Sequence, residues 1–127
     1  MLPVERVIGE EGLASNGGAV KLAMRLPWYR SLPFSTVEIG SLSVDGEDID
    51  LSAAQIEYDG KTWNLAENGD KVDSFWFVRD SAFLILPGYS LPAGSKHTVS
   101  LIINVSPPYI PGMKRVNPQT QTLYVAA

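Results

Sequence analysis

Apolar and polar residues alternate along several short stretches of the chain, which is the pattern of β-strands with one buried face. From residue 19 to 26 the alternation is clear, with Lys21 and Arg25 on the polar side. The same alternation recurs at 36–44 and 98–105. No window shows apolar residues at three- and four-residue spacing over three turns, and nine prolines and eleven glycines interrupt the chain. The pattern therefore predicts strands rather than helices.

Two Asp-Gly pairs, at 45–46 and 59–60, predict tight reversals of the chain. Asp and Gly tolerate the positive φ angles that two-residue hairpin turns require. A two-residue turn at the second pair would place Ile56 opposite Trp63 across a hairpin. Gly40 interrupts the strand that precedes the first pair, which predicts a bulge or a close approach between strands.

An unbroken apolar run lies within 73–80 and predicts a strand buried on both faces. A shorter strand at 83–86 ends at Pro87-Gly88, and 122–125 adds a last strand or remains part of a tail. With frequent turn signals between them, these stretches give about seven to nine strands. The sequence thus predicts one all-β domain over 1–127, folded as a single antiparallel β-sandwich.

Composition narrows the class of protein. Of 127 residues, 45% are hydrophobic and 19% are charged, which suits a globular domain. The formal charge of −4 is scattered, without the basic stripe that binds nucleic acid. No secretory leader is recognisable, and no apolar run approaches the ~20 residues of a membrane span. We therefore expect a soluble, cytoplasmic protein that binds neither nucleic acid nor membrane.

Few residues are suited to catalysis. There is no cysteine, which excludes a thiol nucleophile and cysteine-based metal sites, and His97 is the only histidine. An exposed polar residue at the start of a strand is the favoured interpretation of His97, and the alternative is a self-sufficient enzyme that uses His97 with an acidic neighbour. Four acidic residues near the first turn lack the spacing of a calcium-binding EF-hand, which favours a solvated turn. These are Asp45, Glu47, Asp48 and Asp50. The residues therefore indicate no catalytic group and no metal ligand in this chain.

Two proline-containing segments have the composition of binding surfaces. The first, 25–35, places Trp28, Tyr29 and Arg30 between two prolines, and these residue types dominate protein–protein contacts. An equally good interpretation is a loop over the end of the sandwich, with Trp28 filling the core. The second segment, 107–113, is stiff, aromatic and apolar, which predicts either a structural cap or a rigid binding edge.

The first segment also belongs to a longer pattern. It contains Arg25-Leu26-Pro27-Trp28-Tyr29-Arg30-Ser31-Leu32-Pro33, and further matches follow at 44–47, 76–80, 94–99 and 108–109. In this order the motifs resemble the C-glycoside deglycosidase β-subunit family. The resemblance covers about residues 8–113 and leaves 114–127 as a C-terminal tail.

The resemblance implies a β-sandwich subunit that pairs with a larger α subunit in a bacterial hetero-oligomer. That partner is expected to be a TIM barrel similar to sugar isomerases, holding a divalent metal ion, usually manganese. The complex would act as a lyase on the carbon–carbon bond between a 3-oxo sugar and an aromatic aglycone such as a flavonoid. This chain would hold no cofactor and no catalytic residue, and it would be inactive alone.

The family interpretation makes the first segment the contact with the α subunit. The residues expected at that contact are Arg25, Pro27, Trp28, Tyr29, Arg30, Leu32, Pro33 and Phe34. Those expected at the edge of the substrate pocket are Pro108, Tyr109 and Ile110. Arg25 would support the loop by ion pairing. The alternative is a carbohydrate-binding β-sandwich module that recruits glycosides through exposed aromatic residues such as Trp28 and Trp63.

Overall fold

Strands make up most of the protein. The computed structural model describes residues 6–16 and 18–126, and within these ranges the chain forms eleven strands and two short 3-10 helices. The strands are β1 (Ile8–Asn16), β2 (Ala19–Arg25), β3 (Leu32–Pro33), β4 (Val37–Val44), β5 (Glu47–Asp48), β6 (Gln55–Tyr58), β7 (Lys61–Asn64), β8 (Phe75–Trp76), β9 (Ser81–Pro87), β10 (Lys96–Val105) and β11 (Arg115–Ala126). The helices are η1 (Phe34–Thr36) and η2 (Leu65–Asp70), and neither has the length and apolar content of a membrane span. The all-β prediction is confirmed.

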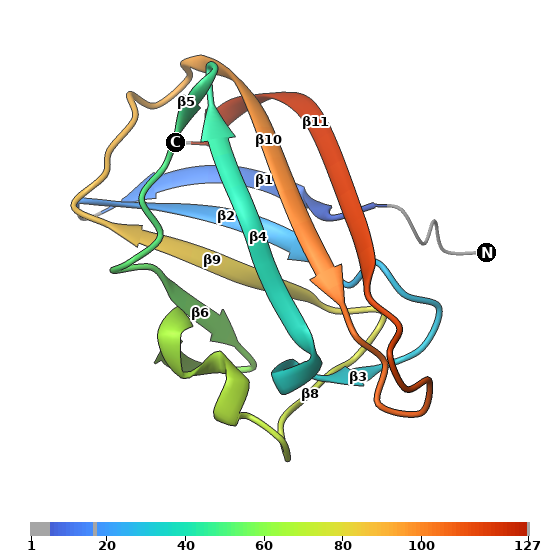
Figure 1. The fold of residues 1–127 in the computed structure, drawn as a ribbon. Coiled ribbons are helices and arrows are strands. Elements are labelled where there is room, and N and C mark those ends of the chain that lie inside the picture. Colours follow the sequence, from blue (N-terminus) through green and yellow to red (C-terminus); the bar gives the residue numbers. More distant parts are fainter. Residues whose placement is uncertain (1–5, 17, 127) are drawn as a thin grey trace.

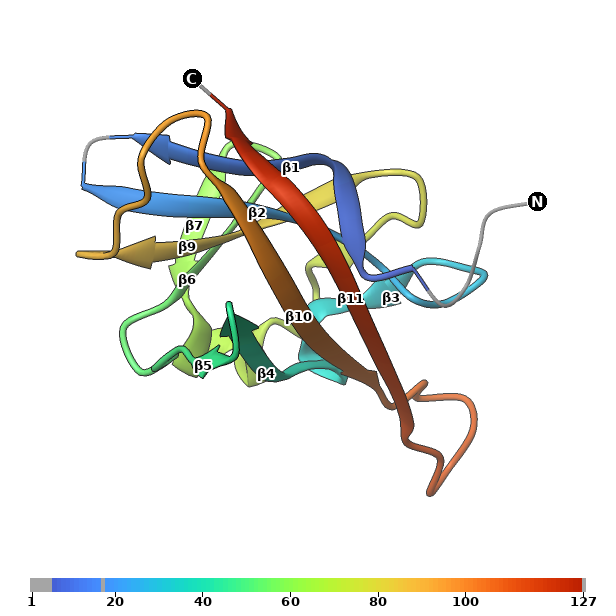
Figure 2. The same ribbon diagram turned by 90° about the horizontal axis from the view of Figure 1, so that it is seen from above.

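Nine of these strands form one sheet that curls until its two halves face each other. The strand order is β5-β4-β10-β11-β1-β2-β9-β6-β7, and β3 pairs with β8 in a separate two-stranded sheet. In Figures 1 and 2, β4, β10 and β11 lie across β1, β2 and β9, as the two layers of a sandwich do. The halves are joined where β1 runs parallel to the end of β11, through the pairs Leu13–Val125 and Ala14–Ala126. The described strands therefore include one parallel pair, which the antiparallel prediction lacked.

The inward faces of the two halves form one hydrophobic core. Alternating residues of β2 and β10, such as Leu22 and Leu101, are fully buried. Aromatic rings close the core beside η1, where Phe34 stacks on Trp76 with ring centres 5.3 Å apart. Trp63 meets Phe34 edge-on at 5.0 Å. Burying one such ring contributes about 2–3 kcal/mol to folding, so this group anchors the end of the sheet where the two predicted binding segments lie.

Both predicted Asp-Gly turns are confirmed. The φ angles are 53° and 83° at residues 45–46, and 51° and 76° at residues 59–60. Positive φ at both positions is typical of the type I′ turn, whose twist matches that of the strands it joins. The second turn pairs Ile56 with Trp63, as predicted. The strands predicted at 19–26, 36–44, 83–86 and 98–105 are also confirmed, as β2, β4, β9 and β10.

Gly40 forms the predicted bulge in β4. The register between β4 and β10 shifts between Ile102 and Ile103, opposite this glycine. A Cβ atom at Gly40 would lie 3.0 Å from Nδ2 of Asn104 and 3.1 Å from Cγ2 of Ile102. The glycine is therefore needed because β10 approaches closely, since any larger residue would push against that strand.

The apolar run at 73–80 was wrongly predicted to be a strand buried on both faces. Only Phe75 and Trp76 are in a strand, and Phe77 is exposed along with Phe75. The backbone N–H of Asp80 donates to the carbonyl of Phe77 at 2.9 Å, and the indole of Trp76 donates to the carbonyl of Asp80. These contacts turn the chain at 77–80, so the run cannot continue as a strand.

β1 was not predicted, and of β11 only 122–125 was considered as a possible strand. Residues 115–126 form a strand twelve residues long whose residues 115–124 pair with β10, so the expectation of a tail at 114–127 is wrong over the described residues. The alternation of apolar and polar residues is not visible in β11 because inward-facing positions are polar. Asn117 is buried, and Gln119 lies where β11 meets the start of β1. The side-chain oxygen of Gln119 accepts the backbone N–H groups of Val7 and Ile8 at 2.8 and 2.9 Å. In β1 a register shift between Ile8 and Leu13 breaks the alternation.

Candidate functional site

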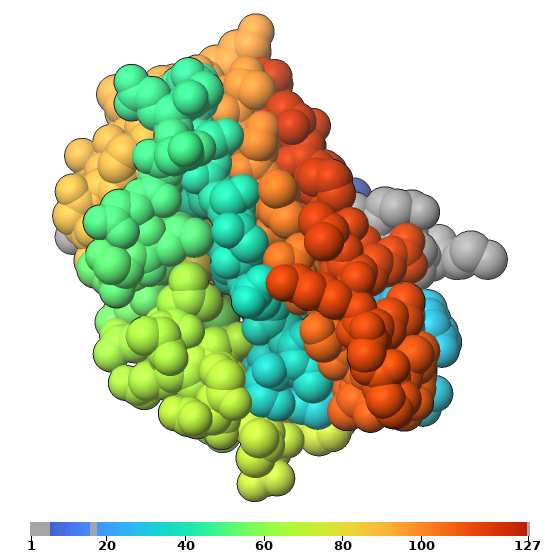
Figure 3. Space-filling model, viewed as in Figure 1, coloured from blue at the N-terminus to red at the C-terminus, as the bar shows by residue number. Residues whose placement is uncertain are grey.

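The structure brings the two predicted binding segments together at one end of the molecule. Figure 3 shows the 106–114 loop lying against the chain that follows β2. The indole N–H of Trp28 donates to the hydroxyl of Tyr109 at 2.6 Å, and the hydroxyl oxygens of Tyr109 and Tyr29 lie 3.5 Å apart. The guanidinium of Arg30 lies 5.1 Å from the centre of the Tyr109 ring. Tyr29 and Tyr109 remain 60% and 46% exposed.

We call the exposed part of this cluster, Tyr29, Arg30, Pro108 and Tyr109, the tyrosine surface. Within this surface, the Tyr109 hydroxyl is the group whose pKa the neighbouring side chains lower. Desolvation acts to raise the pKa of Tyr109, but hydrogen bonding with Tyr29 and Trp28 and the nearby Arg30 cation outweigh it and lower that pKa below its usual value. The phenol is therefore held in place by the indole and made more acidic by hydrogen bonds with Tyr29 and Trp28 and, to a smaller extent, by the Arg30 cation, while its ring remains partly exposed.

Several residues predicted at the α-subunit contact are instead part of the core. Leu32 and Phe34 are fully buried, Pro27 is buried, and Trp28 is only 4% exposed. Phe34 cannot reach a partner because it is enclosed between other aromatic rings. These four residues can therefore influence a partner only by maintaining the conformation of the loop. For Trp28 this agrees with the alternative interpretation, in which its side chain fills the core.

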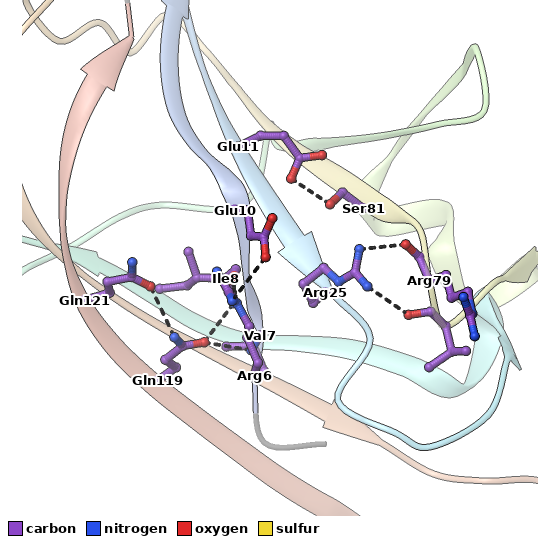
Figure 4. A network of polar contacts seen from close by, with 11 residues as sticks. Arg6, Val7, Ile8, Glu10, Glu11, Arg25, Arg79, Ser81, Gln119 and Gln121 are labelled. Atoms are coloured by element: carbon purple, nitrogen blue, oxygen red, sulfur yellow. Dashed lines mark hydrogen bonds and ion pairs between the residues drawn. The ribbon is translucent and has the colours of Figure 1, made fainter. Parts of the chain in front are cut away.

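Arg25 was predicted to support the 25–35 loop by ion pairing, but its guanidinium instead binds backbone carbonyls of the 78–80 turn. Its Nη1 and Nη2 donate to the backbone carbonyls of Arg79 and Val78 at 2.7 and 3.2 Å. Figure 4 shows the guanidinium of Arg25 directed at this turn. The contact fixes the 78–80 turn against the end of β2.

Ile110, predicted at a pocket edge, is partly buried and packs against the core, whereas its neighbours Pro108 and Tyr109 are exposed. The backbone N–H of Ile110 donates to the carbonyl of Pro107 at 3.1 Å, and that of Met113 donates to Ile110 at 3.2 Å. These two turns make the loop compact, so Tyr109 is presented on a well-defined backbone.

Beside Trp28 the surface opens into a cleft of about 760 Å³. The ends of β1, β2 and β9 form it, together with the turns at 58–59 and 78–80. On one side Ser81 donates its hydroxyl to Glu11 at 2.8 Å, and on the other Arg6 lies 3.8 Å from Glu10 (Figure 4). No motif in the sequence indicated this cleft, because its residues come from separate elements.

Tyr58 closes one end of the cleft. Its hydroxyl donates to Oδ2 of Asp80 at 2.7 Å and accepts the backbone N–H of Phe77 at 3.0 Å. Burial, with a smaller contribution from the hydrogen bond to Asp80, raises the pKa of Tyr58 to about 12. Tyr58 therefore stays protonated over the physiological range and tethers the 77–80 turn to β6.

His97 lies in a contact that its sequence context did not suggest. Its Nδ1 is 2.7 Å from Oδ2 of Asp45 and its Nε2 is 2.7 Å from Oγ of Ser95, with 14% of its side chain exposed. The order of the groups matches a catalytic triad, but the Ser95 hydroxyl donates to the carbonyl of Pro92. The backbone N–H groups of Ser95 and Gly94 are also bonded to carbonyls, so neither can stabilise an oxyanion. The arrangement therefore fastens a loop and does not support a self-sufficient enzyme.

The acidic residues near the first turn do not converge on a metal site. Asp45 uses one oxygen for His97 and the other for the backbone N–H of Thr98, and Asp50 accepts the N–H of Ser52. Throughout the part of the chain that the structure describes, no group of three or more His, Cys, Asp or Glu side chains could hold a metal ion.

The premise of the carbohydrate-module alternative is also wrong. Trp63 is only 8% exposed, and its indole donates to Oδ1 of the buried Asn68 at 3.0 Å. Trp28 is equally enclosed. Neither ring is available as a platform on which a sugar could stack.

Fold and surfaces together define a small all-β domain with an exposed tyrosine surface and an open polar cleft at one end. The family model of the C-glycoside deglycosidase beta subunit matches residues 9–109. The chain is 39% identical over 107 residues to the 3'-dehydrocarminate deglycosidase beta subunit of Microbacterium sp, covering 84% of this chain and 80% of that protein. It is 30% identical over 126 residues to the C-glycoside deglycosidase beta subunit of Microbacterium trichothecenolyticum, covering 98% and 90% of the two chains. The chain belongs to the C-glycoside deglycosidase beta subunit family.

Proposed function

We propose that this chain is the non-catalytic β subunit of a bacterial, cytoplasmic C-glycoside deglycosidase and docks on its α subunit through the tyrosine surface. The main support for this proposal is that Tyr29, Arg30 and Tyr109 are exposed side by side, while the buried Trp28 holds the Tyr109 hydroxyl through a hydrogen bond. Tyrosine and arginine bury large areas and keep a polar group for the partner, and a preformed loop loses little entropy on docking.

The proposed reaction of the complex depends on a ketone at C3 of the sugar, next to the carbon that loses a proton. A 3-oxo group makes the proton on C2 of the sugar acidic, and a divalent metal ion in the α subunit, which we expect to be manganese, would polarise that ketone. A base removes the C2 proton, a C1–C2 double bond forms, and the aglycone leaves with the electron pair of the C1–carbon bond and takes up a proton at that carbon. The name of the Microbacterium sp relative, which specifies a 3'-dehydro compound, supports a 3-oxo substrate.

Within this scheme the chain shapes the site and contributes no reacting group. Pro108 and Tyr109 would stand at the edge of the substrate pocket, where the rigid 106–114 loop limits how the α subunit closes. The partner is expected to be a TIM barrel similar to sugar isomerases. Because this chain would hold neither metal nor base, it is inactive alone.

The double variant Tyr29→Ser with Arg30→Gln tests the docking surface. Both side chains are exposed, so the variant should unfold at the same temperature as the parent chain, yet its co-purification with the co-expressed α subunit should fall at least about tenfold. Trp28 is unsuited to this test, because its removal would cost about 3–5 kcal/mol of stability.

A matched control lies at the far end of the β10–β11 hairpin, where Lys96 and Tyr124 are paired and exposed. Lys96→Gln with Tyr124→Ser removes the same kinds of groups from a different surface and should leave the complex intact. A Tyr29/Arg30 variant that still forms a fully active complex would refute the docking assignment.

A further inference from the structure

The cleft beside Trp28 carries charges of both signs and is separate from the exposed tyrosines. Three guanidinium groups and four carboxylates line it. They belong to Arg6, Arg25, Arg79, Glu10, Glu11, Asp59 and Asp80. Its volume of about 760 Å³ lies within the ~300–1,000 Å³ typical of small-molecule sites.

Some of these charged side chains already make hydrogen bonds within the protein, which hold them in place. Arg25 donates two hydrogen bonds to backbone carbonyls. One carboxylate oxygen of Glu11 accepts the hydroxyl of Ser81, and one of Asp80 accepts the hydroxyl of Tyr58. Arg6 and Glu10 lie 3.8 Å from each other, and Nε of Arg6 donates to the carbonyl of Ile8. In the described residues, neither the guanidinium of Arg79 nor the carboxylate of Asp59 makes a hydrogen bond or ion pair. The cleft is therefore lined by residues with free donors and by residues with free acceptors.

Gly9 in β1 leaves room for the contact between Ser81 and Glu11, two residues that line the cleft. A Cβ atom at Gly9 would lie 2.9 Å from Cβ of Ala23 and 3.0 Å from both Oε1 of Glu11 and Oγ of Ser81. Because glycine has no side chain, Ser81 can reach Glu11. These polar groups are thus positioned before any ligand arrives, which reduces the entropy cost of binding.

The charge pattern selects the chemistry of the ligand. An anion would meet four carboxylates, a cation would meet three guanidinium groups, and an apolar molecule would leave these groups unpaired. A hydroxyl group both donates and accepts, so neighbouring hydroxyls satisfy donor-only guanidinium and acceptor-only carboxylate groups together. We infer that this cleft binds a neutral, hydroxyl-rich ligand, a sugar or a related polyol. The inference stands independently of the docking proposal.

The isolated chain and two simple probes, glucose and myo-inositol, test this inference by nuclear magnetic resonance. Titration should shift the indole N–H signal of Trp28 and the backbone amides of Arg79 and Asp80, with saturation. The indole of Trp63 provides an internal reference, because it is bonded to the buried Asn68 away from the cleft lining. Sodium acetate and arginine amide, an anion and a cation, should produce no saturable shift.

Two variants sharpen the test. Arg79→Gln and Asp59→Asn each remove one unpaired charge, and Asn retains the positive φ that position 59 requires. Each should weaken glucose or inositol binding at least about tenfold, the effect of losing a charge-assisted hydrogen bond. Glu47→Gln and Lys96→Gln remove exposed charges outside the cleft and should leave the affinity unchanged.

Three outcomes would overturn the inference. They are the absence of saturable shifts with both probes, equal affinity in the cleft and control variants, and binding of arginine amide in place of the polyols. The last result would identify the cleft as a receptor for a basic protein segment. The Tyr29→Ser/Arg30→Gln variant should bind the polyols normally, so failure of docking and failure of ligand binding are read separately.

Discussion

Asp45 shows how one residue can serve both a turn and a long-range contact. Its positive φ shapes the turn between β4 and β5, and its carboxylate accepts the backbone N–H of Thr98 and contacts His97. The turn was predictable because Asp-Gly chemistry is local. The contact with His97 was not, because 52 residues separate the partners and only the fold brings them together.

The pH dependence of stability tests this contact. The hydrogen bonds from His97 and from the Thr98 N–H lower the pKa of Asp45 below its usual value. A carboxyl group whose pKa is lower in the folded state stabilises that state above its unfolded pKa of about 3.9, and the contribution disappears as pH falls through the folded pKa. Asp45→Asn should therefore lower the urea midpoint at neutral pH and flatten its decline below about pH 4. An unchanged pH profile would contradict this role.

At the scale of elements, the side-chain amide of Asn68 makes three of the bonds that hold η2 to the rest of the fold. Asn68, which is buried, donates from Nδ2 to the carbonyls of Phe34 and Val37 at 2.8 and 2.9 Å and accepts the indole N–H of Trp63. These three bonds connect η2 with η1, β4 and β7. Asn68 is the only buried residue of η2, so this amide is expected to contribute much of what holds η2 in place, together with Leu65, which packs against the core and donates its N–H to the carbonyl of Ala54.

Asn68→Ala should destabilise the protein by about 2–4 kcal/mol. The change leaves the indole N–H of Trp63 without its acceptor and removes one donor each from the carbonyls of Phe34 and Val37, of which that of Phe34 keeps the backbone N–H of Val37. Each unsatisfied group costs about 1–3 kcal/mol before relaxation. Asn64→Ala is the matched control, since Asn64 is exposed and its side-chain bonds to Glu67 and Gln55 lie at the surface. Its expected change is within about 0.5 kcal/mol. Urea denaturation measures the free energy of unfolding of both variants. Equal losses of stability in the two variants would contradict the proposed role of Asn68.

The sequence predicted some elements well and others poorly, for identifiable reasons. β2, β4 and β10 were predictable because each buries one face and alternates accordingly. β8 was predicted too long because hydrogen bonds at 77–80, not composition, end the strand. For the site, 25–35 and 107–113 stood out by composition, but their contact through Trp28 and Tyr109 and the cleft beside it depend on tertiary structure.

At the scale of the whole molecule, β11 connects the two halves of the sheet. It pairs with β10 over ten residue pairs, from Lys96–Tyr124 to Val105–Arg115, and runs beside β1 at its end. Gln119 extends this seam by accepting the N–H groups that open β1. The strand is thus integral to the core.

Removal of residues 115–126 should abolish cooperative folding. The deletion would expose the inner face of β10 and leave the edges of both β10 and β1 without partners, which favours aggregation. Loss of the cooperative thermal transition by circular dichroism is the expected result. A truncated chain that unfolds cooperatively near the temperature of the intact chain would restore the interpretation of this segment as a tail.

The parallel pairing of β1 with β11 also constrains the order of events on the ribosome. β1 can meet β2 as soon as both have emerged, but its other edge must wait until about a hundred more residues have been made. During that interval β1 presents open backbone groups to neighbouring nascent chains. Because the two strands of this pair lie so far apart in the sequence, the sheet is completed late in folding, after β11 has been made.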